Sequence, residues 1–259
     1  MESFFNFSYN EIVAFALVLL RMIGFIVAMP VIGSSNVPAP TKVLLALTLT
    51  FILFPTINHS KLEADINSLA IITIGVKEVF IGLTFGFIAR LFFMAVSMAA
   101  HIMSVSMGVA SAQLFDPSMG EVSTALDQFY IYLASLFFLT INGHHLLISG
   151  IFELYSIVPI SKTLISLSGF QDFGVTVQKI MAAALKMSAP ILVSIFFMNV
   201  AVALIGRAVP QINILITSLP VNVLVGFVVL FIGLPLLIWQ LTQLLDLTSM
   251  ELLRIIKSY

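Results

Sequence analysis

Charged side chains that could do chemistry interrupt the apolar segments of this 259-residue sequence. They include Arg21, the adjacent pair Lys77 and Glu78, Arg90 and Lys186. A charge inside a membrane costs at least about 2.5–3.5 kcal/mol on insertion scales, so such residues face other protein segments or water. The chemistry open to them is ion pairing across segments or the transfer of protons.

Four residues of one segment recur at intervals of four and lie on one helical stripe: Glu78, Gly82, Gly86 and Arg90. The two glycines allow another helix backbone to approach closely. Glu78 and Arg90 are twelve positions apart, about 18 Å along a helix axis, so each needs its own partner elsewhere. We favour a helix-packing face buried against other subunits. The alternative is a helix packed inside this chain with its charged ends reaching toward water.

The histidines do not have the spacing of a metal site. Those of the segment 142–145 (Asn-Gly-His-His) are adjacent, so on a helix they would point about 100° apart, unlike the i, i+4 pair of a zinc-binding helix. The next carboxylate along the chain is Glu153. We expect hydrogen bonding at a helix break from this segment, and structural roles for His59 and His101.

Catalytic and nucleotide-binding signatures are absent from the sequence. It contains no P-loop, no GxGxxG and no nucleophile elbow. Asp116, Asp127, Glu153 and Asp246 show no paired-carboxylate spacing, and the chain has no cysteine for thiol chemistry. We therefore predict a protein that is not an enzyme, binds no cofactor and does not hydrolyse ATP.

Composition decides the class of protein that must position these residues. Hydrophobic residues make up 60% of the chain and charged residues only 9%, with mean hydropathy +1.15. A soluble domain carries about 25% charged residues, so this is an integral membrane protein. The net charge of −1 gives no case for nucleic-acid binding. Glu2 and Glu11 precede the first apolar run without a basic region, so we expect that run to stay in the mature protein.

The apolar runs predict an all-α membrane protein of about six long, broken helices. About 20 residues span a bilayer as a helix, and the period-2 alternation of barrel strands is missing. Arg254 and Lys257 favour a cytoplasmic C-terminus. The longest polar connectors, 58–68 and 159–176, leave no room for a soluble domain. The six runs are 12–32, 43–57, 69–109, 126–158, 177–209 and 212–241.

The polar joint at 207–220 is the most informative break in the apolar sequence. Pro210 and Pro220 each remove a backbone donor, and Gln211 and Asn213 bring amides that hydrocarbon solvates badly. Such a bend must be buried in protein or must line water. It indicates a subunit whose membrane segments serve other chains. A second break, the small-residue segment 108–120, is either a surface loop or a mobile segment inside a pore.

Motifs in order along nearly the whole chain resemble the FliR/SctT/SpaR family of type III secretion export-gate subunits. Asn-Gly-His-His resembles the flagellar members more than the injectisome ones, and Thr217-Ser218 departs from the family pattern, in which glycine is common. The motifs are Arg21-Met-Ile-Gly24, Pro30-Val-Ile-Gly33, Pro38, Pro40, Lys42, Leu45-Ala-Leu-Thr48, Glu78-x-x-x-Gly82-x-x-x-Gly86, Asp116-Pro117, Asn142-Gly-His-His145, Asn199, Arg207-x-x-Pro210-Gln-x-Asn213 and Pro220.

The resemblance implies one copy of this chain, stacked as helical hairpins with several copies of FliP and FliQ in the bacterial inner membrane at the flagellar basal body. Residues 1–175 would be the FliP-like part and 176–259 a FliQ-like hairpin. Unfolded flagellar substrates would pass through the shared channel, with FlhB as a further partner and energy supplied elsewhere. By the same resemblance, the channel plug would include Leu114, Phe115, Asp116 and Pro117, and the hairpin turn Arg207, Pro210, Gln211, Asn213 and Pro220.

The alternative function is a stand-alone, proton-coupled secondary transporter. Glu78, Arg90 or Asp127 would then relay protons at a midplane site formed by broken helices. Such transporters usually carry inverted repeats, and the sequence shows no matching halves.

Overall fold

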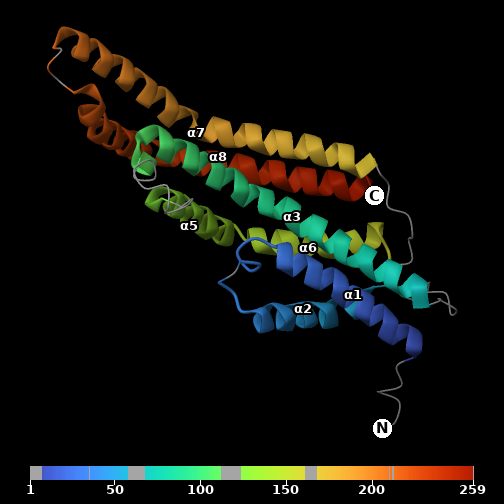
Figure 1. Ribbon diagram of the computed structural model, residues 1–259. Coiled ribbons are helices and arrows are strands. Elements are labelled where there is room, and N and C mark those ends of the chain that lie inside the picture. Colours follow the sequence, from blue (N-terminus) through green and yellow to red (C-terminus); the bar gives the residue numbers. More distant parts are fainter. Residues whose placement is uncertain are drawn as a thin grey trace. The chain divides into compact units, whose positions relative to one another are not determined.

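The computed structural model describes residues 8–34, 36–57, 68–111, 124–160, 168–209, 211 and 213–258. All regular elements in these ranges are helices (Figure 1), which confirms the all-α prediction. The 3₁₀ helices are η1 (Phe54–Thr56) and η2 (Val109–Ser111). The α-helices are α1 (Tyr9–Ala28), α2 (Ala39–Leu53), α3 (Ser68–Met107), α5 (Ala125–Thr140), α6 (Gly143–Ile157), α7 (Ser168–Ala208) and α8 (Ile214–Ser258).

The six predicted runs correspond to α1, α2, α3, the pair α5 and α6, α7 and α8. Among the described residues, five helices are long and apolar enough to cross a membrane, or six if α5 and α6 count as one interrupted span. The interruption falls at the predicted break, where Asn142 adopts the left-handed conformation with φ 57°. A short polar residue tolerates that conformation better than most, so it can end one helix and start the next.

Two helix boundaries differ from those expected. α7 begins at Ser168, inside the predicted connector 159–176, and α8 continues to Ser258, well past the apolar run ending at 241. A contact that hydropathy does not reveal joins these two extensions: Thr176 Oγ1 of α7 donates a 2.9 Å hydrogen bond to Glu251 Oε2 of α8, and both residues are buried. Each polar extension thus supplies a buried partner for the other.

Serine and threonine start two of the helices by the same local mechanism. Ser8 precedes α1 and forms a capping box with Glu11, and Thr124 precedes α5 and forms one with Asp127. In each box a side-chain oxygen accepts from a free backbone N–H of the first turn while the acid three residues on accepts from the cap residue. Asp127 is thereby engaged in a cap.

Prolines lie inside α7 and α8 without ending them. Pro190 is within α7, and Pro220 and Pro235 are within α8. In membrane helices such positions are tolerated because neighbouring groups satisfy the backbone carbonyl that loses its donor. The polar joint is therefore shorter than the predicted range 207–220.

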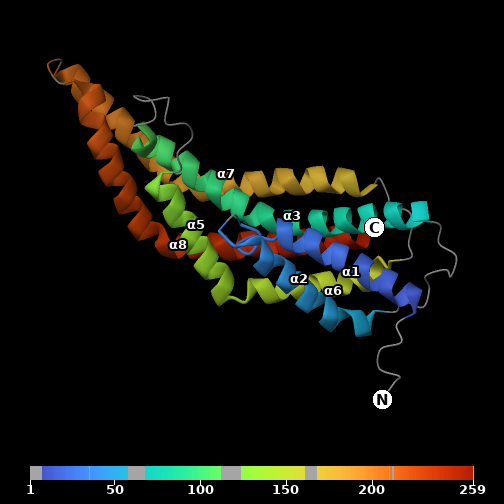
Figure 2. The same ribbon diagram turned by 60° about the horizontal axis from the view of Figure 1, so that its bottom comes forward.

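The chain divides into two compact units, and α3, α7 and α8 each contribute to both. Unit 1 contains residues 1–91, 142–176 and 248–259. In this unit α1 contacts α2 through the ring of Phe15, whose centroid lies 5.1 Å from that of Phe51 and 5.5 Å from that of Phe54. On its other side α1 lies along α3, as both views show (Figures 1 and 2). Fully buried side chains such as Leu17, Met22 and Phe25 place the core of the unit on this helix.

Unit 2 contains residues 92–141 and 177–247. Here α7 and α8 run side by side in both views (Figures 1 and 2). Their contact includes a polar pair, in which Asn222 Nδ2 of α8 donates to Asn199 Oδ1 of α7 over 2.9 Å. The parts of these two helices that lie in unit 2 therefore form a helical hairpin.

Candidate functional site: a buried ionic cluster of α1, α3 and α6

Three of the charged residues flagged in the first and third apolar runs meet inside unit 1: Arg21, Lys77 and Glu78. Arg21 lies on the buried face of α1 and Glu78 on the facing side of α3, and neither side chain is exposed to solvent. Arg21 Nε donates to Glu78 Oε2 in an ion pair that joins the two helices. Hydrocarbon solvates neither charge, so each requires a partner of opposite charge. We expected other subunits to supply these partners, but here both belong to the same chain.

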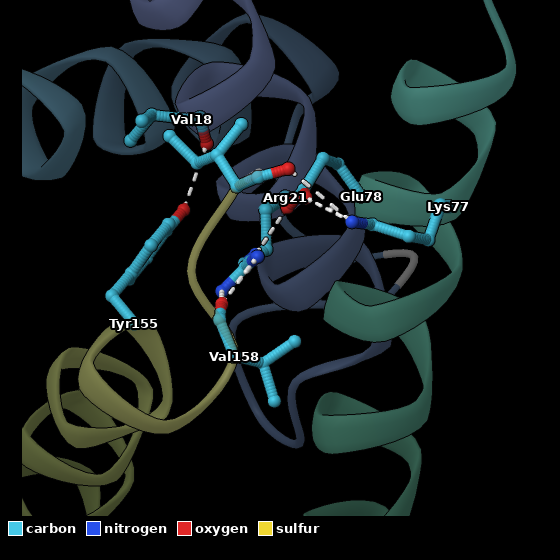
Figure 3. A network of polar contacts seen from close by, with 7 residues as sticks. Val18, Arg21, Lys77, Glu78, Tyr155 and Val158 are labelled. Carbon is cyan, nitrogen blue, oxygen red and sulfur yellow. Dashed lines mark hydrogen bonds and ion pairs between the residues drawn. The ribbon is translucent and has the colours of Figure 1, made fainter. Parts of the chain in front are cut away.

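The rest of the Arg21 guanidinium binds the end of α6. Nη1 and Nη2 each donate to the carbonyl oxygen of Val158 at 3.0 Å, and the guanidinium carbon lies 4.0 Å from the centroid of the Tyr155 ring. The Tyr155 hydroxyl in turn donates to the Val18 carbonyl of α1 over 3.2 Å. Figure 3 shows these side chains pointing toward one another from three segments. Arg21 therefore ties α6 to α1 and α3.

Lys77 completes the cluster beside Glu78. Its ammonium group donates to the Ile160 carbonyl at 3.3 Å and lies 3.5 Å from Glu78 Oε1. Two cations thus share one carboxylate. The carbonyl oxygens of Val158 and Ile160, which follow the C-terminal end of α6, supply further negative potential, since a helix C-terminus carries a partial negative charge.

Close backbone packing between α1 and α3 surrounds the cluster. A Cβ at Gly82 would meet the Arg21 carbonyl oxygen and lie 2.9 Å from Phe25 N, and one at Gly86 would lie 2.7 Å from Ala28 Cβ. From the other helix, a Cβ at Gly24 would lie 2.6 Å from Val79 O. These glycines bring the helices close enough for Arg21 to reach Glu78.

The predicted packing stripe is thereby divided. Glu78, Gly82 and Gly86 are buried against α1 of the same chain, which was our alternative to an assembly face. Arg90, the fourth member, is exposed, and no described carboxylate pairs with it. The reason is geometric: α1 ends at Ala28, which lies beside Gly86, so α1 does not extend to Arg90.

The other acid that was considered for proton transfer has a structural setting in unit 2. Asp127 Oδ2 accepts from Thr124 N over 2.8 Å and lies 3.6 Å from His101 Nδ1. Ser104 Oγ donates to Thr124 Oγ1 over 2.8 Å. This group joins the end of α3 to the start of α5.

The adjacent histidines of α6 form no metal site with the described residues, among which no group of three or more potential ligands is found. The ring centroids of His144 and His145 are 4.2 Å apart. His144 Nδ1 is buried without a hydrogen bond among the described atoms. The described residues show no hydrogen bond from either imidazole, so the expected bonding role of these side chains stays a prediction; the break itself is bonded through the backbone, where His145 N donates to the Asn142 carbonyl over 2.9 Å.

The predicted hairpin turn is only partly described. α7 ends one residue after Arg207, Gln211 lies in a turn, and Asn213 precedes α8 and accepts from Thr217 N over 3.1 Å. Pro220 lies inside α8, and Pro210 falls outside the described residues. The predicted plug residues Leu114, Phe115, Asp116 and Pro117 also fall outside them, so that assignment stays a prediction.

The sequence marks Arg21, Lys77 and Glu78 as charges that need partners, but it does not reveal which groups those partners are. Tyr155 and the carbonyls of Val18, Val158 and Ile160 carry no sequence signal, since a backbone carbonyl is present at every position. Chemically, the cluster can hold three segments together. Its carboxylate is enclosed and already paired.

Comparison with known proteins identifies the family of this chain. The model of the family described as bacterial export proteins, family 1, matches residues 12–248, which include the ionic cluster and the hairpin. The chain belongs to this family of bacterial export proteins. Its family therefore agrees with the resemblance read from the sequence motifs.

Individual relatives of this export protein match over most of their length. A protein named flagellar biosynthetic protein FliR from Bacillus subtilis is 32% identical over 240 residues, covering 91% of each chain. Proteins of the same name from Escherichia coli and Caulobacter vibrioides are 27% and 29% identical, covering 85% and 90% of this chain and 83% and 94% of their own. The similarity therefore extends over both compact units.

Proposed function

We propose that this export-family protein is a non-enzymatic structural subunit of the flagellar type III protein export apparatus in the bacterial inner membrane. The observation that carries the proposal is the 32% identity to a flagellar biosynthetic protein over 91% of both chains. The helices long enough to cross a membrane support the location in a bilayer. The matched family is one of export proteins, which does not favour the stand-alone transporter.

Within that apparatus the chain would form, with FliP and FliQ homologues, the channel through which unfolded flagellar substrates pass, next to an FlhB homologue. The resemblance of the motifs supports these partners and the division into a FliP-like part, 1–175, and a FliQ-like hairpin, 176–259. The ionic cluster suits a structural subunit because it fixes three segments of unit 1. A surface built on such a unit keeps its shape when a partner binds.

The gating role in this proposal is steric. A segment within 108–120, with Leu114, Phe115, Asp116 and Pro117 at its centre, would seal the channel between substrates. This gating role rests on the resemblance of the motifs, as do the proposed partners. Proton-motive force and a separate ATPase would supply the energy.

The proposal is tested by deleting the gene in its own bacterium. Electron microscopy should show no flagellar filaments, and expression of the intact chain should restore them. Detergent extraction should yield a defined complex with FliP and FliQ homologues, whose mass is measured natively. Filaments in the deletion strain, or a lone chain that transports a solute when reconstituted, would refute it.

A further inference from the structure

α7 and α8 each contain a proline near the middle of the helix. Pro190 divides α7 into residues 168–189 and 191–208, and Pro235 divides α8 into residues 214–234 and 236–258. Figure 2 shows both helices changing direction about half-way along their length. Proline kinks a helix because it has no N–H to donate and because its ring clashes with the carbonyl four residues earlier. The two bends therefore have a local cause in the sequence.

The two prolines lie at the same level of the hairpin. Gly233 and Leu236, which lie on either side of Pro235, line the same cavity as Pro190. This cavity has a volume of about 30 Å³ and lies within unit 2. A Cβ at Gly233 would meet no described heavy atom within 4 Å. Protein interiors contain few such voids, so the side chains at this level have room to rearrange. We call the level of Pro190 and Pro235 the proline joint.

A side chain of α8 replaces the backbone bond that α7 loses at Pro190. Because proline has no N–H, the carbonyl of Lys186, four residues earlier, has no helical donor. Gln240 Nε2 donates to this carbonyl oxygen over 3.4 Å. A hydrogen bond of this length is weak, so it can break and form again without a large change in free energy.

The two helices are joined more firmly on the far side of the proline joint. There Asn222 Nδ2 donates to Asn199 Oδ1 over 2.9 Å, and Asn222 is buried. We call residues 191–208 of α7 and 214–234 of α8 the hairpin tip, and residues 177–189 and 236–247 the hairpin base; all are helical and lie in unit 2. Tip and base thus meet where a backbone bond is missing and packing is incomplete.

We propose that the proline joint is a hinge about which the hairpin tip swings against the hairpin base, and that Gln240 is the positioning residue that holds the bent state. In this state Gln240 binds the carbonyl that Pro190 leaves free. When the tip swings, that bond breaks, and the flexible side chains of Met103 and Met187 in the cavity wall adapt to the change. The hinge lies within one chain, so it depends neither on the proposed function nor on the proposed partners.

Distances between spin labels test the hinge, because the chain has no cysteine of its own. Tyr132→Cys on α5 is combined with Leu204→Cys in the hairpin tip, or with Ala182→Cys in the hairpin base as the matched control. All three positions are exposed. With the full-length chain in nanodiscs, double electron–electron resonance should give a broad distance distribution for the tip pair and a narrow one for the base pair. Equally narrow distributions for both pairs would overturn the hinge.

Replacing the prolines should fix the hairpin tip in one position. Pro190→Ala together with Pro235→Ala restores both backbone donors, so the distribution of the tip pair should become as narrow as that of the base pair. The distribution of the base pair should not change. A tip distribution that stays broad without the prolines would show that they are not the hinge.

Gln240→Leu tests the positioning residue in the same labelled chains. It should lower the ratio of bent to straighter populations in the tip pair about threefold, the size expected for one hydrogen bond between membrane helices. In the Pro190→Ala background Gln240→Leu should have no effect, because the Lys186 carbonyl then has its helical donor again. A purely structural role of Gln240 would give the same effect in both backgrounds, which would overturn its assignment, as would no effect in either.

Discussion

Arg21 and Glu78 form a fully buried ion pair although 57 positions separate them in the chain. The pair forms because Gly24, Gly82 and Gly86 let α1 and α3 approach closely. Arg21 and Lys77 together carry one positive charge more than Glu78 neutralises. Two backbone carbonyls at the end of α6 accept hydrogen bonds from these two cations. A chain with only 9% charged residues thus places three of them at one point of its core.

Removing one partner of this pair should destabilise the protein strongly. Arg21→Leu leaves Glu78 buried beside Lys77 alone, and breaking a buried pair in this way costs about 3–5 kcal/mol. The midpoint of denaturant-induced unfolding in detergent should fall accordingly. Arg90→Leu, at an exposed arginine of α3, is the control and should leave the midpoint unchanged. Equal midpoints for both variants would show that the cluster does not stabilise the fold.

A double replacement should recover part of that loss. Arg21→Met combined with Glu78→Leu removes both charges, so no unpaired carboxylate remains in the core. The double variant should lose less unfolding free energy than the two single variants lose together, and a double-mutant cycle measures this difference. Additive losses would mean that the two side chains do not interact.

A methyl group at Gly82 should separate α1 from α3. The added Cβ would meet the backbone of Arg21, which cannot move aside as a side-chain tip can, so Gly82→Ala should cost about 1–3 kcal/mol. Gly233→Ala in α8 is the control, because no described heavy atom lies within 4 Å of its Cβ and alanine favours helix. Thermal unfolding of the two purified variants measures the difference. A Gly82→Ala protein as stable as Gly233→Ala contradicts the close approach.

The asparagine pair of the hairpin should couple α7 to α8. Asn222→Leu removes the donor to Asn199 Oδ1, and such bonds between membrane helices contribute about 0.6 kcal/mol on average and about 1.7 kcal/mol at most. Asn199→Leu and the double variant complete the cycle, measured by unfolding in bicelles. A coupling energy of zero would show that the bond is absent in the bilayer.

Deleting part of 108–120 should make the assembled complex leak ions if this segment seals the channel. The measurement is ion conductance of the reconstituted complex, with an equal deletion in the connector 58–68 as the control. Conductance that is the same in both deletions and in the intact complex would refute the plug.

The sequence alone determined the class of the protein and the order of its helices. A long apolar run forms a helix in a bilayer whatever its neighbours are, because every backbone group must be hydrogen-bonded within the segment. The helix break at Asn142 can also be predicted from the sequence, since an asparagine followed by a glycine is a local signal for it. The charges at Arg21, Lys77 and Glu78 were recognised as costly, and hence as needing partners.

The tertiary structure alone decided which partners those charges have. The stripe from Glu78 to Arg90 has one sequence pattern, yet its first three residues pack on α1 of the same chain and its last is exposed. Helical periodicity states which residues share a face, but what covers that face depends on where α1 ends in space. The same holds for the polar ends of α7 and α8, which meet through a hydrogen bond between residues 75 positions apart in the chain.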